Sequence, residues 1–229
     1  MKALLYKEFK LAMHPICYVF ICLFPFMLLI PSYPLGVAFI YLMSCYPVLF
    51  LGANKGQQSN DLLFSTLLPI RKKDIVKARI ITVIIMQVAY MLIMTALYPV
   101  AVKLEESMVA AGAEDVMHAG IGLNGYVSVL AIGVVGFAIA DLIFFPIYYK
   151  NGKSIVMSTL FTILGFVVYL GIFTVALPYI PGMEWYTDIL CNRGIGIQFV
   201  ILAGAILVSI GLHILVYKIS SKKLEQVDF

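Results

Sequence analysis

Charged residues divide the chain into long apolar segments separated by short polar ones. No Asp, Glu, Lys or Arg occurs between Lys10 and Lys55, and this run could cross a hydrocarbon core of about 30 Å twice, since a spanning helix needs about 20 residues. Two prolines in "PSYP" at 31–34 disfavour continued helix and divide the run into a helical hairpin. The same pattern predicts six spanning helices in all, at about 15–31, 35–53, 80–102, 124–149, 154–177 and 195–217.

The composition agrees with a membrane protein, because 62% hydrophobic and 12% charged residues exclude an ordinary water-soluble domain. We expect an all-α fold, since lipid leaves unpaired backbone groups unsatisfied at several kcal/mol each and helices pair them internally. Residues 1–229 are interpreted as a single polytopic transmembrane domain that contacts the lipid bilayer. The four cysteines show neither a disulfide framework nor a metal-ligand spacing.

The basic residues predict the orientation of these spans. If the N-terminus is cytoplasmic, only Lys103 and Arg193 of the sixteen Lys and Arg residues fall on the outer side. Cytoplasmic segments of membrane proteins are enriched in Lys and Arg, so we expect both termini in the cytoplasm. The inner loop at 54–78 ends in a dense basic cluster, which with the start of the third span forms a cytoplasmic anchor: Arg71, Lys72, Lys73 and Arg79.

The first residues, "MKALLYKEFKLAMH", predict a helix at 1–13 that lies in the membrane interface. Leu4 and Phe9 fall on its broad apolar side, and Lys7 and Lys10 lie opposite, where they can attract anionic lipid. Glu8 is the exception, because it falls within the apolar arc and is interpreted as directed at a partner. The alternative is a simple positive segment that orients the first span.

Asp141 lies deep inside the fourth predicted span. Nine residues separate it from Lys150, about 13 Å of helix, which places it near the middle of the membrane. A central carboxylate costs about 2.5–3.5 kcal/mol, so such groups usually face a bundle interior. Four residues on other helices share this depth and complete a predicted polar layer in which Gln87 or a hydroxyl satisfies the carboxylate: Ser44, Gln87, Thr162 and Ser209. The alternative is a protonated aspartate with one local backbone contact.

Other candidate chemistry is weak. The chain holds no Gly-x-x-x-x-Gly-Lys-Ser/Thr phosphate loop, and "GIGLNG" at 120–125 follows no predicted strand, so we expect no nucleotide site. His14, His118 and His213 are scattered over three segments, and the Glu105–Glu106 pair has no histidine at a metal-ligand spacing. No set of catalytic residues converges on one depth, which argues against a membrane enzyme.

The inner loop contains "NKGQQSND" followed by "LLFSTLLPIRKKDIVKAR". Asn60 or Asp61 can cap a short helix that runs through Leu67, and Pro69 ends it. This short helix projects from the cytoplasmic side, where it can contact a cytosolic protein.

Together with "FFPIYYKNGKS" at 144–154 and "LLYKEFKL" near the N-terminus, this loop resembles the permease subunits of type-2 ABC exporters. The similarity is to their compact six-span branch, which includes exporters of phenol-soluble modulins and antimicrobial peptides. It implies a coupling helix that docks on a separate ATPase, an interfacial connecting helix at the N-terminus, a second permease copy, and a peptide substrate. The docking residues would be Glu8, Asn60, Asp61, Leu62, Leu63, Phe64, Ser65, Leu67 and Leu68.

The resemblance also implies a bacterial cell membrane, ATP and Mg²⁺ bound by the partner ATPase rather than by this chain, and no role for nucleic acid. An exporter of lipid-like drugs, or a bacteriocin-immunity transporter, is the alternative within the class. An ion-coupled secondary transporter with Asp141 as its proton site is the alternative of another class.

Overall fold

The computed structural model describes residues 2–30, 34–48, 70–111, 122–151, 155–176 and 195–226. These residues form helices and no strand, which confirms the all-helical class for this part of the chain. The elements are α1 (Lys2–Lys7) with a π-helical turn η1 (Glu8–Ala12), α2 (Ile16–Leu23) with a 3₁₀ turn η2 (Phe24–Leu29), α3 (Pro34–Val48), α5 (Lys72–Ala110), α6 (Gly122–Asn151), α7 (Ile155–Leu170) with a π-helical turn η3 (Gly171–Ala176), and α10 (Ile195–Glu225).

Four helices of the described segments are long and apolar enough to cross a membrane. They cover Lys72–Met108, Tyr126–Lys150, Ile155–Phe173 and Gly196–Glu225, in place of the third to sixth predicted spans. Within the first two predicted spans the described residues form the apolar helices Ile16–Leu29 and Gly36–Tyr46, whereas residues 31 and 49–53 lie outside the described part of the chain, so these two spans stay a prediction. Pro25 explains why the first of these helices is not regular throughout, because α2 tightens into η2 around it and the backbone at Ile30 is extended.

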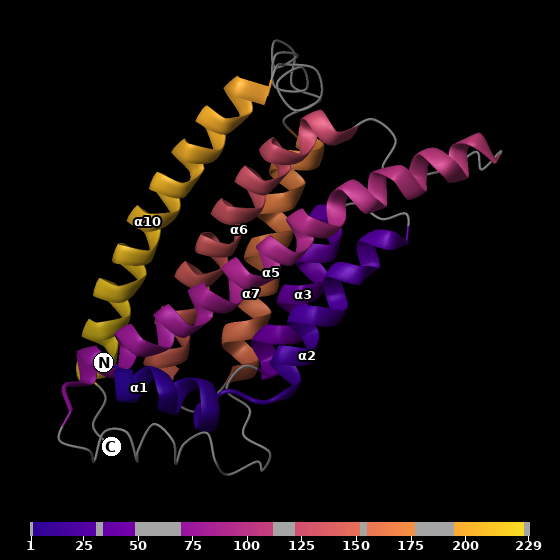
Figure 1. The fold of residues 1–229 in the computed structure, drawn as a ribbon. Coiled ribbons are helices and arrows are strands. Elements are labelled where there is room, and N and C mark those ends of the chain that lie inside the picture. The colour runs from indigo at the N-terminus through magenta and orange to yellow at the C-terminus, as the bar shows by residue number, and fades with distance from the viewer. Residues whose placement is uncertain are drawn as a thin grey trace.

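The helices share one strongly basic end (Figure 1). At this end α5 begins with Lys72 and Lys73, and α6 and α10 end with Lys150 and with Lys222 and Lys223; we call it the basic end. Lys73 Nζ lies 3.3 Å from Glu225 Oε1 and joins the start of α5 to the end of α10. Helix α1 crosses the bundle at the same end, where it contacts α5 (Figure 1). The cytoplasmic location of this end stays a prediction.

Helix α5 is longer than the predicted third span. Its 39 residues measure about 58 Å, nearly twice the hydrocarbon thickness. It begins at Lys72, so the last part of the expected loop at 54–78 is helical, and Asp74 in the first turn complements the helix dipole. It also continues through Pro99 to Ala110, and Figure 1 shows this end extending away from the bundle.

Aromatic rings from four helices fill the centre of the bundle. Tyr41 of α3 stacks on Tyr90 of α5 with ring centroids 4.1 Å apart, and Phe137 of α6 meets both rings edge-on. Phe166 of α7 stacks on Phe137 at 6.5 Å. These contacts fix the rotation of α3, α5, α6 and α7 about their axes. This rotation determines which polar side chains of each helix face inward.

Gly136 allows α6 and α7 to approach closely, and we expect Gly136→Ala to destabilise the protein by about 1–3 kcal/mol through overpacking. An added Cβ would lie 2.8 Å from Phe166 and 2.9 Å from Tyr169, whose ring is held by a 2.8 Å hydrogen bond to the Ile132 carbonyl. Equilibrium unfolding in mixed detergent micelles measures the change. Gly204→Ala is the control, because its Cβ would meet nothing within 4 Å. Equal stability of both variants would contradict the prediction.

Candidate functional site: a buried polar cluster beside an apolar groove

Asp141 is fully buried in α6, and side chains from three other helices converge on it. The Tyr46 hydroxyl of α3 donates a hydrogen bond to Oδ1. The Gln87 amide nitrogen of α5 lies 3.0 Å from Oδ2, and His213 Nε2 of α10 lies 3.1 Å from the same oxygen. The aspartate therefore links α3, α5, α6 and α10 inside the apolar bundle. We call Asp141, Tyr46, Gln87 and His213 the Asp141 cluster.

The hydrogen bonds of the Asp141 cluster define where its protons lie. Gln87 Nε2 also lies 3.0 Å from the Tyr46 hydroxyl, which accepts from Gln87 and donates to Asp141. His213 Nδ1 lies 2.7 Å from the Ser209 carbonyl, which can only accept, so Nδ1 carries a hydrogen. One further proton lies between His213 Nε2 and Asp141 Oδ2. Tyr46 and Gln87 donate to the carboxylate from one side, and His213 meets it from the other.

The structure brings together some residues of the predicted polar layer and separates others. Gln87 contacts Asp141 directly, and Ser209 contacts it through His213, with Oγ 3.3 Å from Nδ1. Thr162 does not belong to the cluster, because its hydroxyl donates to the Ser158 carbonyl on α7 itself at 2.7 Å. These side-chain partners also differ from the alternative of a single local backbone contact.

Tyr46 occupies the place on α3 that depth alone suggested for Ser44, which is half-buried. The two residues point about 200° apart around a helix, so only one of them can face Asp141. His213 was also missed, although it follows Ser209 by four residues and therefore shares its helix face. That spacing was the signal that could have identified it.

A second polar contact ties the N-terminal helix to the bundle at the basic end. Arg79 Nε of α5 lies 2.9 Å from Glu8 Oε2 of η1, with relative exposures of 1% and 0%. Arg79 Nη1 lies 3.1 Å from the Tyr148 hydroxyl of α6, and the guanidinium lies 6.0 Å from the centroid of that ring. Lys7 Nζ is 3.7 Å from the second Glu8 oxygen. We call this contact of Glu8, Arg79 and Tyr148 the Glu8–Arg79 junction.

The Glu8–Arg79 junction corrects two expectations. Glu8 was predicted to face a docked ATPase, and Arg79 to anchor the loop at the membrane surface, but both side chains are buried. Burial is tolerated because each charge has an opposite partner. Arg71 and Lys73 are exposed and Lys72 is half-buried, as an interfacial anchor requires. The other predicted docking residues lie outside the described residues: Asn60, Asp61, Leu62, Leu63, Phe64, Ser65, Leu67 and Leu68.

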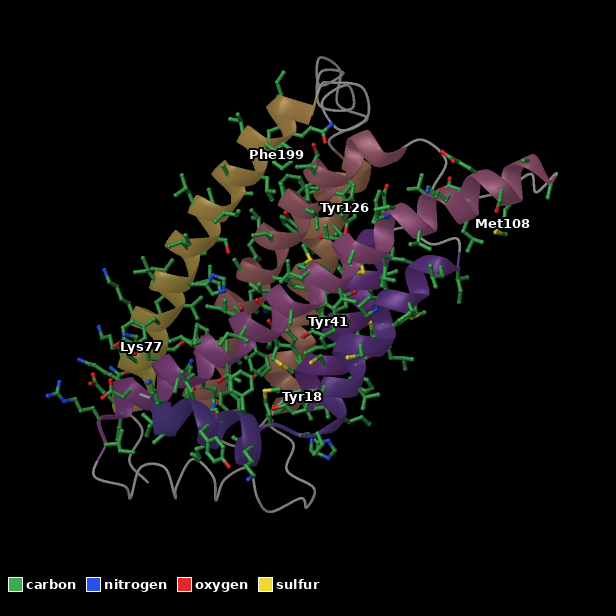
Figure 2. The ribbon with its side chains drawn as sticks, viewed as in Figure 1. Tyr18, Tyr41, Lys77, Met108, Tyr126 and Phe199 are labelled. Carbon is green, nitrogen blue, oxygen red and sulfur yellow. The ribbon has the colours of Figure 1, made fainter. Side chains whose placement is uncertain are left out.

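An apolar groove of about 660 Å³ lies beside the Asp141 cluster, between α5 and α10 with α6 as its floor. Lys77 and Tyr217 line it at the basic end, and Gln87, Ser209 and His213 line its middle. Figure 2 shows Lys77 near the meeting point of α5 and α10, and Phe199 near the opposite end of α10. We call it the α5–α10 groove. The described residues contain no group of three or more His, Cys, Asp or Glu side chains that could hold a metal ion.

Long apolar helices around a buried polar cluster, with an apolar groove between them, define a multi-pass membrane protein. The chain belongs to the ABC-2 family of transporter proteins, whose family model matches residues 3–223. It is therefore the membrane component of an ABC transporter, a class that works with a partner ATPase. No curated protein and no solved structure matched the chain.

Proposed function

We propose that this protein is the permease subunit of an ATP-driven exporter that moves amphipathic, cytolytic or antimicrobial peptides out of a bacterial cell. Membership of the ABC-2 family supports the transport function, and the resemblance of the inner loop supports the peptide cargo. The sequence contains no phosphate-binding loop, so ATP and Mg²⁺ are assigned to a cytosolic partner. A second permease copy completes a central pathway between two subunits.

The observation that carries this proposal is the position of the Glu8–Arg79 junction. Helix α5 begins at Lys72, directly after the predicted coupling helix at 60–68, and Arg79 follows seven residues later. A docked ATPase that moves the loop would therefore move the first two turns of α5. The buried ion pair and the Tyr148 contact would carry this motion to η1 and α6 at the same time. In this geometry, a force applied at the basic end would move η1, α5 and α6 together.

Transport by reconstituted vesicles tests the energy source. We expect a co-purified cytosolic ATPase and ATP to drive uptake of a cationic amphipathic peptide into vesicles whose ATPase side faces outward. Vesicles that contain the permease alone should show no uptake, with or without a pH gradient. Peptide uptake driven by a pH gradient without the ATPase would overturn the proposal.

Variants of the inner loop test the docking surface. Reversal of Arg71, Lys72 and Lys73 to glutamate, or replacement of Leu62 and Phe64 by alanine, should reduce both ATPase co-purification and peptide export by at least about ten-fold. Lys103→Glu is the matched control, because Lys103 is exposed on α5 far from the basic end. Loss of export with ATPase binding intact would argue against docking through this loop.

The Asp141 cluster favours a second candidate, an ion-coupled carrier. An Asp–His pair with its nitrogen and oxygen 3.1 Å apart is a kind of group that can bind and release a proton inside a membrane. The pH-gradient arm of the vesicle experiment distinguishes this candidate from the first. An exporter of lipid-like drugs, or a bacteriocin-immunity transporter, is the alternative within the class. Competition between a lipid-like drug and the peptide for ATP-driven transport would support a drug cargo.

A further inference from the structure

The α5–α10 groove faces the surroundings of the bundle rather than its core. Helices α5 and α10 are joined at the basic end by Lys73 and Glu225 and lie further apart toward the other end (Figure 1). Only 11% of the most apolar window of α10 is buried, the smallest share among the four candidate spans. Side chains along both edges of the groove are half exposed or more, including Val88 and Leu92 on α5 and Ile210 on α10. In a bilayer these edges would meet acyl chains.

The polar side chains in the groove wall direct their hydrogen-bonding atoms into the protein. The Gln87 amide nitrogen and both ring nitrogens of His213 are engaged by the Asp141 cluster and Ser209. The Thr95 hydroxyl donates to the Met91 carbonyl at 2.8 Å within α5. The polar face of an amphipathic peptide would therefore find few partners here. The chemistry of the wall suits a hydrocarbon chain.

The basic end of the groove supplies charge where a lipid headgroup would lie. Lys77 lines the groove and is exposed, and on α10 exposed Lys218 follows the lining residue Tyr217. Ten residues separate Lys77 from Gln87, about 15 Å of helix, which is half of a hydrocarbon core of about 30 Å. The groove continues past this depth to Thr95, and its basic half alone, from the cationic rim to Gln87, has the length of one lipid leaflet. Basic pockets between membrane helices are typical sites for anionic headgroups.

We propose that the α5–α10 groove binds one anionic phospholipid from the leaflet at the basic end, with its phosphate at Lys77 and one acyl chain between α5 and α10. The two other conceivable occupants are a second copy of this chain and an amphipathic peptide. The satisfied polar wall argues against the peptide, and the cationic rim argues against a second copy that brings the same positive charge. This lipid site requires neither the ATPase nor a particular cargo.

Native mass spectrometry of the purified full chain in detergent tests this site, with added phosphatidylglycerol or phosphatidylcholine. The wild type should retain phosphatidylglycerol preferentially. Lys77→Gln should reduce that preference about five-fold, the factor expected for one lysine near an anionic membrane surface. Ile206→Trp places an indole in the groove and should abolish retention of both lipids.

Two variants serve as matched controls. Lys103→Gln removes an exposed lysine of α5 outside the groove, and Leu164→Trp adds an indole at an exposed site on α7. Both should retain phosphatidylglycerol like the wild type. Unchanged retention in Ile206→Trp would overturn the proposal, and so would equal retention of the two lipids by the wild type.

The same measurement identifies the other occupants. A shift from dimer to monomer in Ile206→Trp without loss of bound lipid would assign the groove to a second copy and overturn the lipid site. Displacement of bound phosphatidylglycerol by a cationic amphipathic peptide from both the wild type and Leu164→Trp, together with loss of peptide binding in Ile206→Trp, would assign the groove to cargo and overturn the lipid site. Because no ATPase is present, failure of the export proposal leaves these results unaffected.

Discussion

Replacement of Arg79 by glutamine is expected to lower the free energy of unfolding by about 3–5 kcal/mol, because Glu8 would stay buried with only the longer 3.7 Å contact to Lys7 as a counter-charge. The substitution also removes the 3.1 Å contact with Tyr148. As a result, η1 and α6 would both lose the side chain that joins them to α5 at the basic end. Equilibrium unfolding of the purified protein in mixed detergent micelles measures the change. Arg71→Gln is the control, because Arg71 is exposed and its removal should cost less than about 1 kcal/mol.

A double-mutant cycle separates loss of the pair from loss of either residue. Glu8→Gln combined with Arg79→Gln should be more stable than Arg79→Gln alone, since two neutral amides can hydrogen-bond where one unpaired charge cannot. Strictly additive losses would show that the two side chains do not interact.

The double variant also tests whether the Glu8–Arg79 junction carries motion from the inner loop. If it folds, ATPase binding should persist while peptide export falls, because the inner loop stays intact and only its connection to η1 and α6 is weakened. Wild-type export by the folded double variant would remove the junction from the transport mechanism.

Hydropathy located the long helices of this protein well, but it did not locate either end of α5 or the end of α10. The predicted spans at 80–102 and 195–217 lie inside α5 and α10, which both extend further. Charges mark where a helix leaves the apolar core, whereas a helix ends only where its backbone hydrogen bonds stop. The segment "KLEESMVA" after residue 102 contains good helix formers, so α5 continues through it to Ala110.

The first predicted span, at 15–31, contains less regular α-helix than its apolar length suggests, because α2 ends at Leu23. The whole apolar run is long enough for two spans, but prolines interrupt it more often than the hairpin at 31–34 requires. Pro25 lies inside the first expected span, and there α2 tightens into the 3₁₀ turn η2. Apolar length alone therefore does not show where α-helix changes to a 3₁₀ turn in this span. The effect of Pro25 on the helix could have been recognised from the sequence, because proline removes a backbone donor.

The polar residues show what depth can and cannot predict. Counting residues from the charged ends placed Asp141, Gln87 and Ser209 at one level, and the structure brings them together. Depth does not specify the face of a helix, so Ser44 and Thr162 were included and Tyr46 was not. The pairing of Glu8 with Arg79 joins residues 71 positions apart, and no local pattern encodes it. A charge within an apolar arc does indicate burial, and for Glu8 that was the better interpretation.

Replacement of Asp141 by alanine should destabilise the protein by about 3–5 kcal/mol, the second of the two largest effects we expect. Tyr46, Gln87 and His213 would lose the acceptor that they share inside the bundle. Asp141→Asn should cost less, about 1–3 kcal/mol, because the amide oxygen still accepts one hydrogen bond. Unfolding in mixed micelles measures both variants.

Thr162→Ala provides the comparison within the predicted layer. Its hydroxyl bonds only to the Ser158 carbonyl among the contacts that the structure shows, so its loss should cost about 1 kcal/mol or less. If Thr162→Ala and Asp141→Asn cost the same, depth rather than contact with Asp141 would explain the effect. If Asp141→Asn changes neither stability nor export, the buried layer has no role in either. A folded Asp141→Asn protein with normal ATP-driven export would assign the cluster to the scaffold, whereas loss of export with ATP hydrolysis retained would assign its shared proton to transport.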